Sequence, residues 1–309
     1  MHTLHQYFIN VAPEVKLHVH EAGPKDGKIL LFLHGFPEAA FIWDEVLVHF
    51  ARLGYRAIAP NLRGFEQSSA PRAPEMYRSQ HLCADLRELI AQISSDGKIH
   101  TLIAHDWGGA VAWALANQSP NLIDKLCIIN SPHPATFLRE LQHNTEQIEA
   151  SQYMNFLAKP EAAQLLAENN FARLWPFFRT RHGLDLQATN SSHDPLWLTL
   201  ELKEKYQQVW SMGLHGGCNY YQASPLKPSM AGSGQALSLE IPLERVTISV
   251  PTLVLWGMND VALLPSLLVG LEQYINQLEI RRLPEGSHWL IHEQPDWVCE
   301  CLTQFIEPA

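Results

Sequence analysis

The sequence predicts an α/β fold with a mostly parallel central sheet flanked by helices and an inserted helical lid. Short, continuously apolar runs bounded by turn residues are typical of strands that are buried on both faces. Segments with the apolar spacing of helices alternate with these runs, which indicates βαβ crossovers. The alternation stops near Pro132 and resumes near Val250, so an insertion is expected between two parts of one sheet.

The first two elements are expected to be antiparallel strands. Residues 3–10 and 15–22 alternate apolar and polar side chains on either side of Pro13, a pattern typical of two half-exposed strands in a hairpin. Buried strands are expected at 29–33, 57–59, 101–104, 126–129 and 252–256, with a last strand near 279–283. Helices are expected at 39–52, 79–94, 107–118 and 263–275.

The insertion sets the predicted domain division. We expect residues 1–132 and 250–309 to form an α/β core, and residues 133–249 to form a helical lid with a connecting loop. The lid segment is rich in helix-forming polar residues and in aromatic residues. Its tail from Pro225 to Gly234 collects Pro, Ser and Gly, as loops do.

Composition and charge exclude several classes of protein. The chain has 309 residues, of which 46% are hydrophobic, so it can bury a large core. Its formal charge of −10 repels phosphate backbones and anionic membranes, and we expect no nucleic-acid partner and no membrane contact. Neither a signal peptide nor a long apolar stretch is evident, which predicts a cytoplasmic protein. The sequence leaves a homodimer open.

Cysteine and histidine patterns do not predict a metal site. Five cysteines without a paired framework are typical of free thiols in a reducing compartment. Cys299 and Cys301 have no second pair nearby, and His18 and His20 form a pair without a third ligand. We therefore expect no metal and no other cofactor.

The segment Ala104–Gly109 follows an apolar strand and opens a helical run. Small residues beside Asp106 are what a nucleophile elbow requires, because the sharp turn leaves room only for Gly or Ala. Asp106 would then stand exposed at the carboxyl end of the strand. A helix N-cap is the alternative role for an Asp at this position.

The loop His34–Glu38 also follows an apolar strand. Ligands of open α/β sheets bind beyond these strand ends, and the backbone N–H groups of Phe36 and Trp107 could together form an oxyanion hole. An ordinary Gly-Pro turn is the alternative for this loop.

Two later loops, 256–260 and 285–289, follow the last two strands and supply Asp260 and His288. The order nucleophile, acid, histidine is the chain order of a hydrolase triad on such a sheet. Each residue alone could be an ordinary turn residue. His292 competes with His288 for the role of base, and we interpret it as a residue at the start of the last helix.

These motifs resemble the α/β-hydrolase family, and within it the epoxide hydrolase branch, over nearly the whole chain. The resemblance rests on HGFPE at 34–38, HDWGG at 105–109 and GSHW at 286–289. It implies a cis bond between Phe36 and Pro37, and it places His34 and Pro37 with the oxyanion and substrate-binding residues.

The resemblance also implies two lid tyrosines as acid donors. Tyr221 lies in Asn219–Gln222, which resembles an Asn-aromatic-Tyr-Arg segment with Gln in place of Arg, and Tyr153 matches the first lid tyrosine. Both could instead be packing aromatics, and Tyr220 replaces Tyr221 if the register is off by one.

The nucleophile indicates the reaction class. A carboxylate suits attack on saturated carbon, so Asp106 favours cleavage of a C–O or C–halogen bond. The resemblance implies opening of a small-molecule epoxide to a vicinal diol, through an ester on Asp106 that is hydrolysed by water activated by His288 and Asp260. The alternatives are a haloalkane or haloacid dehalogenase that uses the same Asp, and a non-catalytic binding protein of this fold.

The chain departs from the family pattern at three positions. Residues 61–68 stand where Asp-x-Arg-Gly-x-Gly-x-Ser is usual, so that Asn61 replaces Asp and Glu66 replaces the second Gly. Ala104 replaces the Gly that usually starts the elbow. The geometry of the loop at 61–68 is therefore not predicted.

Overall fold

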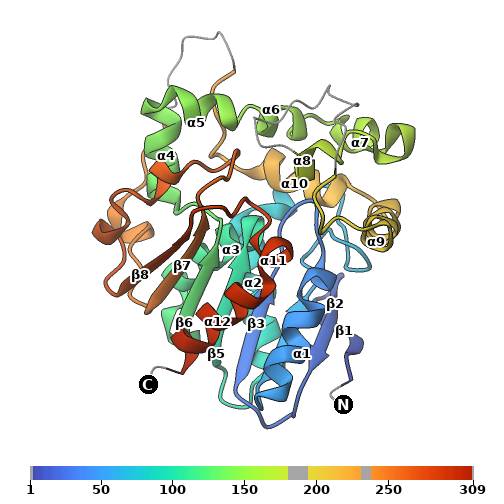
Figure 1. Cartoon of the computed structure of the whole chain (residues 1–309), viewed down its shortest axis with the longest axis vertical. Helices are drawn as coiled ribbons and strands as arrows, with labels where there is room; N and C mark the ends of the chain where they lie inside the picture. Colours follow the sequence, from blue (N-terminus) through green and yellow to red (C-terminus); the bar gives the residue numbers. More distant parts are fainter. Residues whose placement is uncertain (1–2, 180–193, 231–237, 308–309) are drawn as a thin grey trace.

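An eight-stranded sheet forms the centre of the computed structural model, which describes residues 3–179, 194–230 and 238–307. Helices cover both faces of this sheet, and a further layer of helices lies above it (Figure 1). This is the α/β architecture with an inserted helical region that the alternation of apolar runs predicts.

The strand order is β1-β2-β4-β3-β5-β6-β7-β8, and only the pairs β1–β2 and β2–β4 are antiparallel. The interior parallel strands consist almost entirely of buried residues, as their continuous apolar runs predict. Loops that follow parallel strands emerge at one edge of the sheet. The strands are β1 (His5–Ala12), β2 (Val15–Ala22), β3 (Ile29–Leu33), β4 (Arg56–Pro60), β5 (Ile99–His105), β6 (Ile123–Ile129), β7 (Thr252–Gly257) and β8 (Leu278–Leu283).

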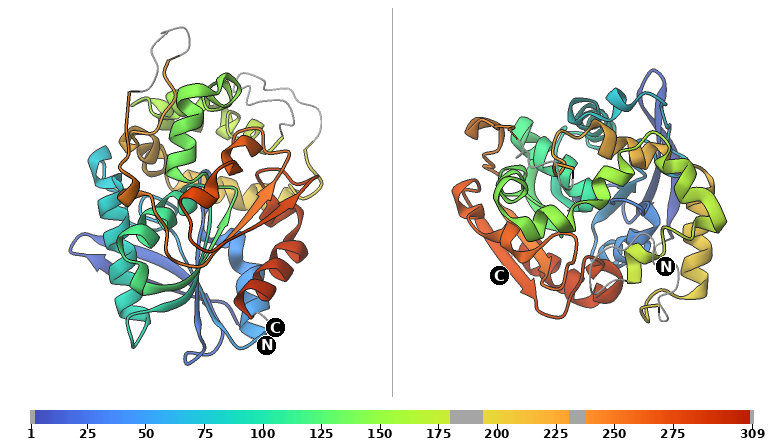
Figure 2. Two further views of the ribbon diagram at one scale, coloured as in Figure 1. Left: turned by 90° about the vertical axis from the view of Figure 1, so that its left-hand side faces the viewer. Right: turned by 90° about the horizontal axis from the view of Figure 1, so that it is seen from above.

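Four long helices pack against the sheet. Figure 2 shows α1 (Asp44–Arg52) and α12 (Pro295–Ile306) on one face, and α2 (Ser79–Ile93) and α3 (Asp106–Gln118) on the other. Helices α1, α2 and α12 each bury an apolar stripe against the sheet, as amphipathic helices do. Shorter elements complete the core: η1 (Ala40–Trp43), η2 (Pro74–Tyr77), η3 (Pro120–Leu122), η5 (Pro265–Leu268), η6 (Leu271–Gln273) and α11 (Leu290–Glu293).

The helices between β6 and β7 form the upper layer (Figure 1). Helix α10 approaches the core so closely that a Cβ on Gly216 would lie 2.2 Å from the carbonyl oxygen of Gly64. The predicted loop Pro225–Gly234 is free of helix and strand as far as Met230, and its remainder lies outside the described residues. The elements are α4 (Pro134–His143), α5 (Thr145–Ala150), α6 (Tyr153–Leu157), α7 (Ala162–Phe171), α8 (Pro176–Arg179), α9 (Leu200–Ser211), α10 (His215–Ala223) and η4 (Leu243–Arg245).

Two details of the sequence prediction are wrong. The expected helix at 263–275 is two short 3-10 turns, η5 and η6, because Gly270 adopts a left-handed backbone with φ +82° between them. Strand β2 is almost fully buried rather than half-exposed. It lies between β1 and β4 in the sheet, and helix α1 packs against it.

All five cysteines are buried and free, as their number and spacing predict. Among the residues that the structure describes, no helix combines the length and the apolar character needed to cross a membrane.

Candidate active site

Asp106 occupies the sharp turn between β5 and α3. Its backbone has φ +49°, in the left-handed region that residues other than Gly rarely adopt. The turn is crowded, because a Cβ on Gly35 would lie 2.1 Å from a carboxylate oxygen of Asp106, and a Cβ on Gly108 would lie 2.6 Å from the carbonyl oxygen of His34. Asp106 is the first residue of α3, and His105 takes the N-cap position. Small residues are therefore required around this carboxylate.

The loop after β3 meets the Asp106 carboxylate. The backbone N–H of Phe36 donates a hydrogen bond to Asp106 Oδ1 at 2.7 Å, and the Phe36–Pro37 bond is cis, as the sequence resemblance implies. The carbonyl of Pro37 accepts a hydrogen bond from the indole of Trp210 at 2.7 Å. Among these loop residues, Phe36 thus faces the carboxylate and Pro37 faces the lid.

The side chain of His34 has a structural position. Its Nδ1–H donates to the carbonyl of Gly35 at 2.9 Å, and its Nε2 accepts a hydrogen bond from the N–H of Leu62 at 3.0 Å. The side chain is fully buried, which lowers the pKa of His34 to about 4. His34 therefore joins two loops as a neutral ring instead of lining the space in front of Asp106.

His288 stands between two carboxylates. Its Nδ1–H donates to Asp260 Oδ2 at 2.7 Å, and its Nε2 lies 3.8 Å from Asp106 Oδ2. The other oxygen of Asp260 accepts hydrogen bonds from the backbone N–H groups of Ala262 and Leu263, at 2.9 Å each. Asp260 is thereby fixed on one side and holds the imidazole on the other.

Asn130, at the end of β6, completes this arrangement and was not predicted from the sequence. Its side-chain amide donates to Asp260 Oδ2 at 2.7 Å, and its carbonyl oxygen accepts the N–H of Gly257 at 3.0 Å. Like Asp106, Asn130 has a left-handed backbone, with φ +39°. The only signal in the sequence is its place directly after an apolar strand.

The carboxylates of Asp260 and Asp106 raise the pKa of His288. Burial by itself would lower the pKa of the imidazole, but the carboxylates of Asp260 and Asp106 outweigh burial and raise the pKa to about 9. Burial alone would raise the pKa of Asp260, but its contacts with His288 outweigh burial and lower that pKa. The protonated imidazole of His288 is therefore favoured between these two side chains.

Two lid tyrosines share a cavity with Asp106. Tyr153 begins α6 and Tyr221 lies in α10, and their rings meet edge to face with centroids 6.1 Å apart. Burial and the nearby Asp106 charge raise the pKa of both phenols. The neighbouring hydroxyl of Tyr220 instead donates to the backbone carbonyl of Arg63 at 3.0 Å.

Trp107 lies beside these tyrosines. Its indole ring meets the ring of Tyr221 edge to face, with centroids 5.0 Å apart. Its backbone N–H, at the second position of α3, is the second expected oxyanion donor, and Trp107 borders the larger of the two cavities described below.

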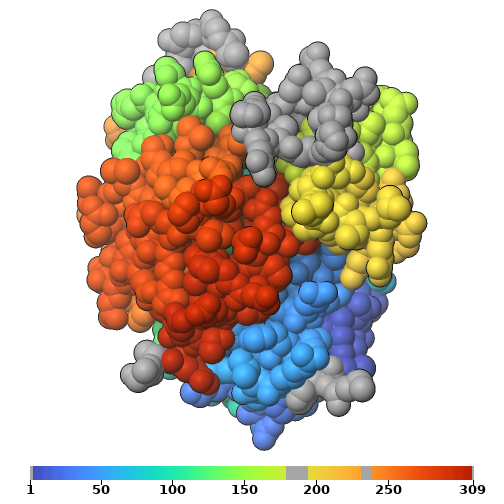
Figure 3. All heavy atoms as spheres, viewed as in Figure 1, coloured from blue at the N-terminus to red at the C-terminus, as the bar shows by residue number. Residues whose placement is uncertain are grey.

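A buried cluster beneath the site was also missed. Glu38 Oε1 accepts hydrogen bonds from Tyr206 and from His292 Nε2, each at 2.7 Å, and Glu38 Oε2 lies 3.2 Å from His105 Nδ1. His105 Nε2 donates to the backbone carbonyl of His288 at 2.9 Å. This cluster holds His292 away from Asp106 and links lid helix α9 to the core, against which α9 packs in Figure 3.

Two cavities border Asp106, and Tyr153 and Tyr221 line both. A small cavity of about 30 Å³ lies between Asp106, His288 and the two lid tyrosines. A larger cavity of about 980 Å³ extends from Asp106 between α3 and the lid, and is lined mainly by apolar side chains. The larger volume is in the range of cavities that hold small organic ligands.

Comparisons with known proteins find relatives of similar sequence and fold. Residues 28–295 match the family described as alpha/beta hydrolase fold. The chain is 30% identical to "Epoxide hydrolase 4" of Mus musculus (95% of this chain, 77% of that protein) and 31% identical to "AB hydrolase superfamily protein YfhM" of Bacillus subtilis (strain 168) (95% of each). A crystal structure of a mutant epoxide hydrolase from Bacillus megaterium, complexed with its product (R)-3-[1]naphthyloxy-propane-1,2-diol, superposes with a TM-score of 0.82. It is 30% identical to this chain, over 97% of this chain and 99% of that one.

Proposed function

This chain belongs to the α/β hydrolase fold family with epoxide hydrolase-like relatives, and on that premise we propose that it opens an epoxide to a vicinal diol through an ester on Asp106. One observation carries the proposal: a carboxylate occupies the sharp turn after β5 and shares a cavity with one histidine and two tyrosines. A carboxylate attacks saturated carbon and leaves an ester that water can hydrolyse.

In the first step, Asp106 Oδ2 attacks an epoxide carbon while Oδ1 stays hydrogen-bonded to the N–H of Phe36. The new C–O bond forms the ester as the C–O bond of the epoxide breaks. The departing alkoxide takes a proton from Tyr153 or Tyr221. The raised pKa of both phenols disfavours free phenolate in the resting site, so each tyrosine is held as a neutral donor.

In the second step, the ester has removed the negative charge of Asp106. That charge helps to raise the pKa of His288, so its loss lowers the pKa, and His288 gives its Nε2 proton to the tyrosinate left by the first step. Neutral His288 then takes a proton from water, and the hydroxide attacks the carbonyl carbon of the ester. The N–H groups of Phe36 and Trp107 stabilise the oxyanion. Its collapse breaks the bond to the substrate oxygen, which takes the proton of the newly formed Asp106 carboxylic acid, so that the diol leaves and the carboxylate is restored.

The larger cavity supports an apolar organic epoxide as the substrate. It extends from Asp106 and Tyr221 along residues such as Val111, Trp113 and Phe137, which offer an apolar surface to a bulky substituent. The Bacillus megaterium relative was crystallised with a diol that carries a naphthyl group.

A single turnover in ¹⁸O-labelled water tests the mechanism. The label should enter the Asp106 carboxylate, and the first diol formed should lack it. Asp106→Asn is the control and should form neither ester nor diol. Label that appears directly in the first diol would contradict the covalent mechanism, and halide release from chloroalkanes without diol from any epoxide would replace the proposed reaction with dehalogenation.

A further inference from the structure

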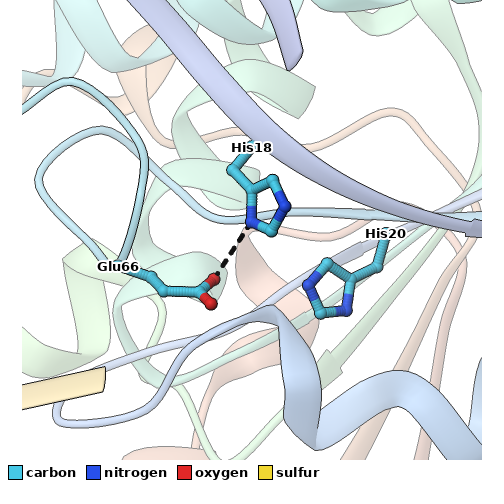
Figure 4. Close-up of side chains that lie close together, drawn as sticks. All are labelled: His18, His20 and Glu66. Carbon is cyan, nitrogen blue, oxygen red and sulfur yellow. Dashed lines mark hydrogen bonds and ion pairs between the residues drawn. The ribbon is translucent and has the colours of Figure 1, made fainter. Parts of the chain in front are cut away.

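In the structure, a carboxylate from another loop lies beside the two histidines of β2, His18 and His20. His18 and His20 are two residues apart on one strand, so their side chains lie on the same face. The carboxylate of Glu66, from the loop after β4, lies beside both rings (Figure 4). Both histidines are buried, and the side chain of Glu66 is 13% exposed.

The ring of His20 has an acceptor nitrogen on the side of Glu66. Its Nδ1 lies 2.6 Å from Asp44 Oδ1, and because a carboxylate only accepts hydrogen bonds, Nδ1 carries the hydrogen. Nε2 is then an acceptor that receives a hydrogen bond from the side-chain amide of Gln6 at 3.2 Å, and Figure 4 shows this nitrogen turned toward Glu66. A histidine held by a carboxylate through one nitrogen is typical of metal sites, where the other nitrogen binds the ion.

His18 and Glu66 are in direct contact, and the side chain of Asn61 lies against both. The N–H of Ala40 donates to Asn61 Oδ1 at 2.7 Å, so the other end of this amide is its NH₂ group. That NH₂ donates to Glu66 Oε2 and, at 3.1 Å, to His18 Nδ1. In the tautomer whose Nδ1 accepts from Asn61, His18 Nδ1 and Glu66 Oε2 face each other as acceptors at 3.2 Å; in the other tautomer, Nδ1–H donates to Glu66. Two ligands of a tetrahedral zinc ion are separated by about 3.3 Å when each bond is about 2.0–2.1 Å long.

The backbone of Glu66 gives independent support. Glu66 has φ +48°, a left-handed conformation that suits Gly and is strained for Glu. The family pattern noted in the sequence has Gly at this position. The chain therefore places a carboxylate beside two imidazoles at the expense of backbone strain.

We propose that His18 Nδ1, His20 Nε2 and Glu66 bind a divalent transition metal of the zinc type. The three ligand atoms lie within 4.8 Å of one another, so small side-chain movements bring them to the spacing of metal ligands, and the ion would take the place of the Gln6 amide on His20 Nε2. Two imidazoles favour zinc, cobalt or nickel over magnesium and calcium, and water can fill a fourth position.

The site is structural, because none of its ligands lines either cavity at Asp106. A metal here would join β2 to the loop at 61–69. That loop supports the lid, since the carbonyl of Arg63 accepts the hydroxyl of Tyr220 and Gly64 packs on Gly216. The metal would therefore stabilise the base on which α10 and Tyr221 rest.

Calorimetric titration of the metal-stripped full chain with Zn²⁺ tests the proposal. We expect one tight zinc ion per chain, a higher melting temperature in zinc, and the absorption of tetrahedral cobalt when Co²⁺ replaces zinc. Glu66→Gly keeps the backbone conformation without strain, so it should stay folded and bind zinc at least about tenfold more weakly. Asp44→Asn should weaken zinc binding about 10–100-fold by releasing the ring of His20.

The matched control is His5→Gln, which removes an exposed histidine of the neighbouring strand β1 and should bind zinc as the unaltered chain does. The proposal is overturned if the chain binds no stoichiometric zinc. It is equally overturned if Glu66→Gly binds zinc as tightly as the unaltered chain, since the ion then lies elsewhere and His18 and Glu66 form a plain ion pair.

Discussion

The charge of Asp106 should control the protonation of His288, and Asp106→Asn tests this without any substrate. The variant keeps the size of the side chain and removes its charge, as ester formation does. In the unaltered chain, burial lowers the pKa of His288, but the carboxylates of Asp260 and Asp106 overcome this effect and raise it to about 9. Removing one of these charges should return the pKa toward the ordinary histidine value of about 6.5.

The magnitude follows from the distance between the two groups. His288 Nε2 and Asp106 Oδ2 are 3.8 Å apart. Two unit charges about 4 Å apart interact by about 4 kcal/mol at an effective dielectric constant of about 20. Each pKa unit corresponds to about 1.4 kcal/mol, so the pKa of His288 should fall by at least about one unit even if half of this interaction is lost to relaxation.

Nitrogen-detected NMR titration of histidine-labelled protein measures the pKa, and the spectrum of His288→Gln assigns the resonance. Asp124→Asn, which removes an exposed aspartate, is the control and should leave the titration of His288 unchanged. An unchanged pKa in Asp106→Asn, or a pKa near 6.5 in the unaltered chain, would refute the reasoning. In that case, formation of the ester on Asp106 would not lower the pKa of His288.

Three further predictions concern the site and the fold. His288→Gln should still form the ester but not hydrolyse it, so intact-mass analysis should find enzyme heavier by one substrate; normal turnover would contradict this role. The double variant Tyr153→Phe, Tyr221→Phe should slow epoxide opening by roughly 10²–10⁴-fold in rapid-quench assays, and an unchanged rate would exclude the tyrosines as acid donors. His34 and His133 are buried, which lowers the pKa of each to about 4. Because unfolding returns both to about 6.5, they should lower the free energy of unfolding by about 4 kcal/mol between pH 7 and pH 5. Urea titrations at the two pH values measure this, and equal stability at both would contradict it.

The sheet was predictable because local signals agree with the topology. Continuous apolar runs such as Ile29–Leu33 are too short for helices and lie between turn residues, so they indicate strands. In a parallel sheet the loops after such strands meet at one edge. For that reason Asp106, Asp260 and His288, far apart in the chain, come together in front of one cavity.

Other parts of the molecule depend on contacts that no local pattern reports. The segment 263–275 has helical apolar spacing, but Gly270 turns left-handed and divides it. In the sequence, Asn130 cannot be distinguished from other polar residues that follow strands. Its role depends on its hydrogen bond to Asp260, which only the folded structure shows. The partners of Glu38 come from α9 and α11, and the sequence contains no signal that brings Tyr206 and His292 together.

The left-handed backbone of Asp106 lowers the stability of the fold, although the proposed reaction requires Asp at this position. Gly would take this conformation without strain, and a strained non-Gly residue costs about 1–3 kcal/mol. Selection for thermal stability alone should therefore favour Asp106→Gly, which removes the proposed nucleophile. If catalysis were not required, Asp would not be favoured at this turn. Stability engineering of this protein should therefore leave residue 106 unchanged and introduce stabilising substitutions at other positions.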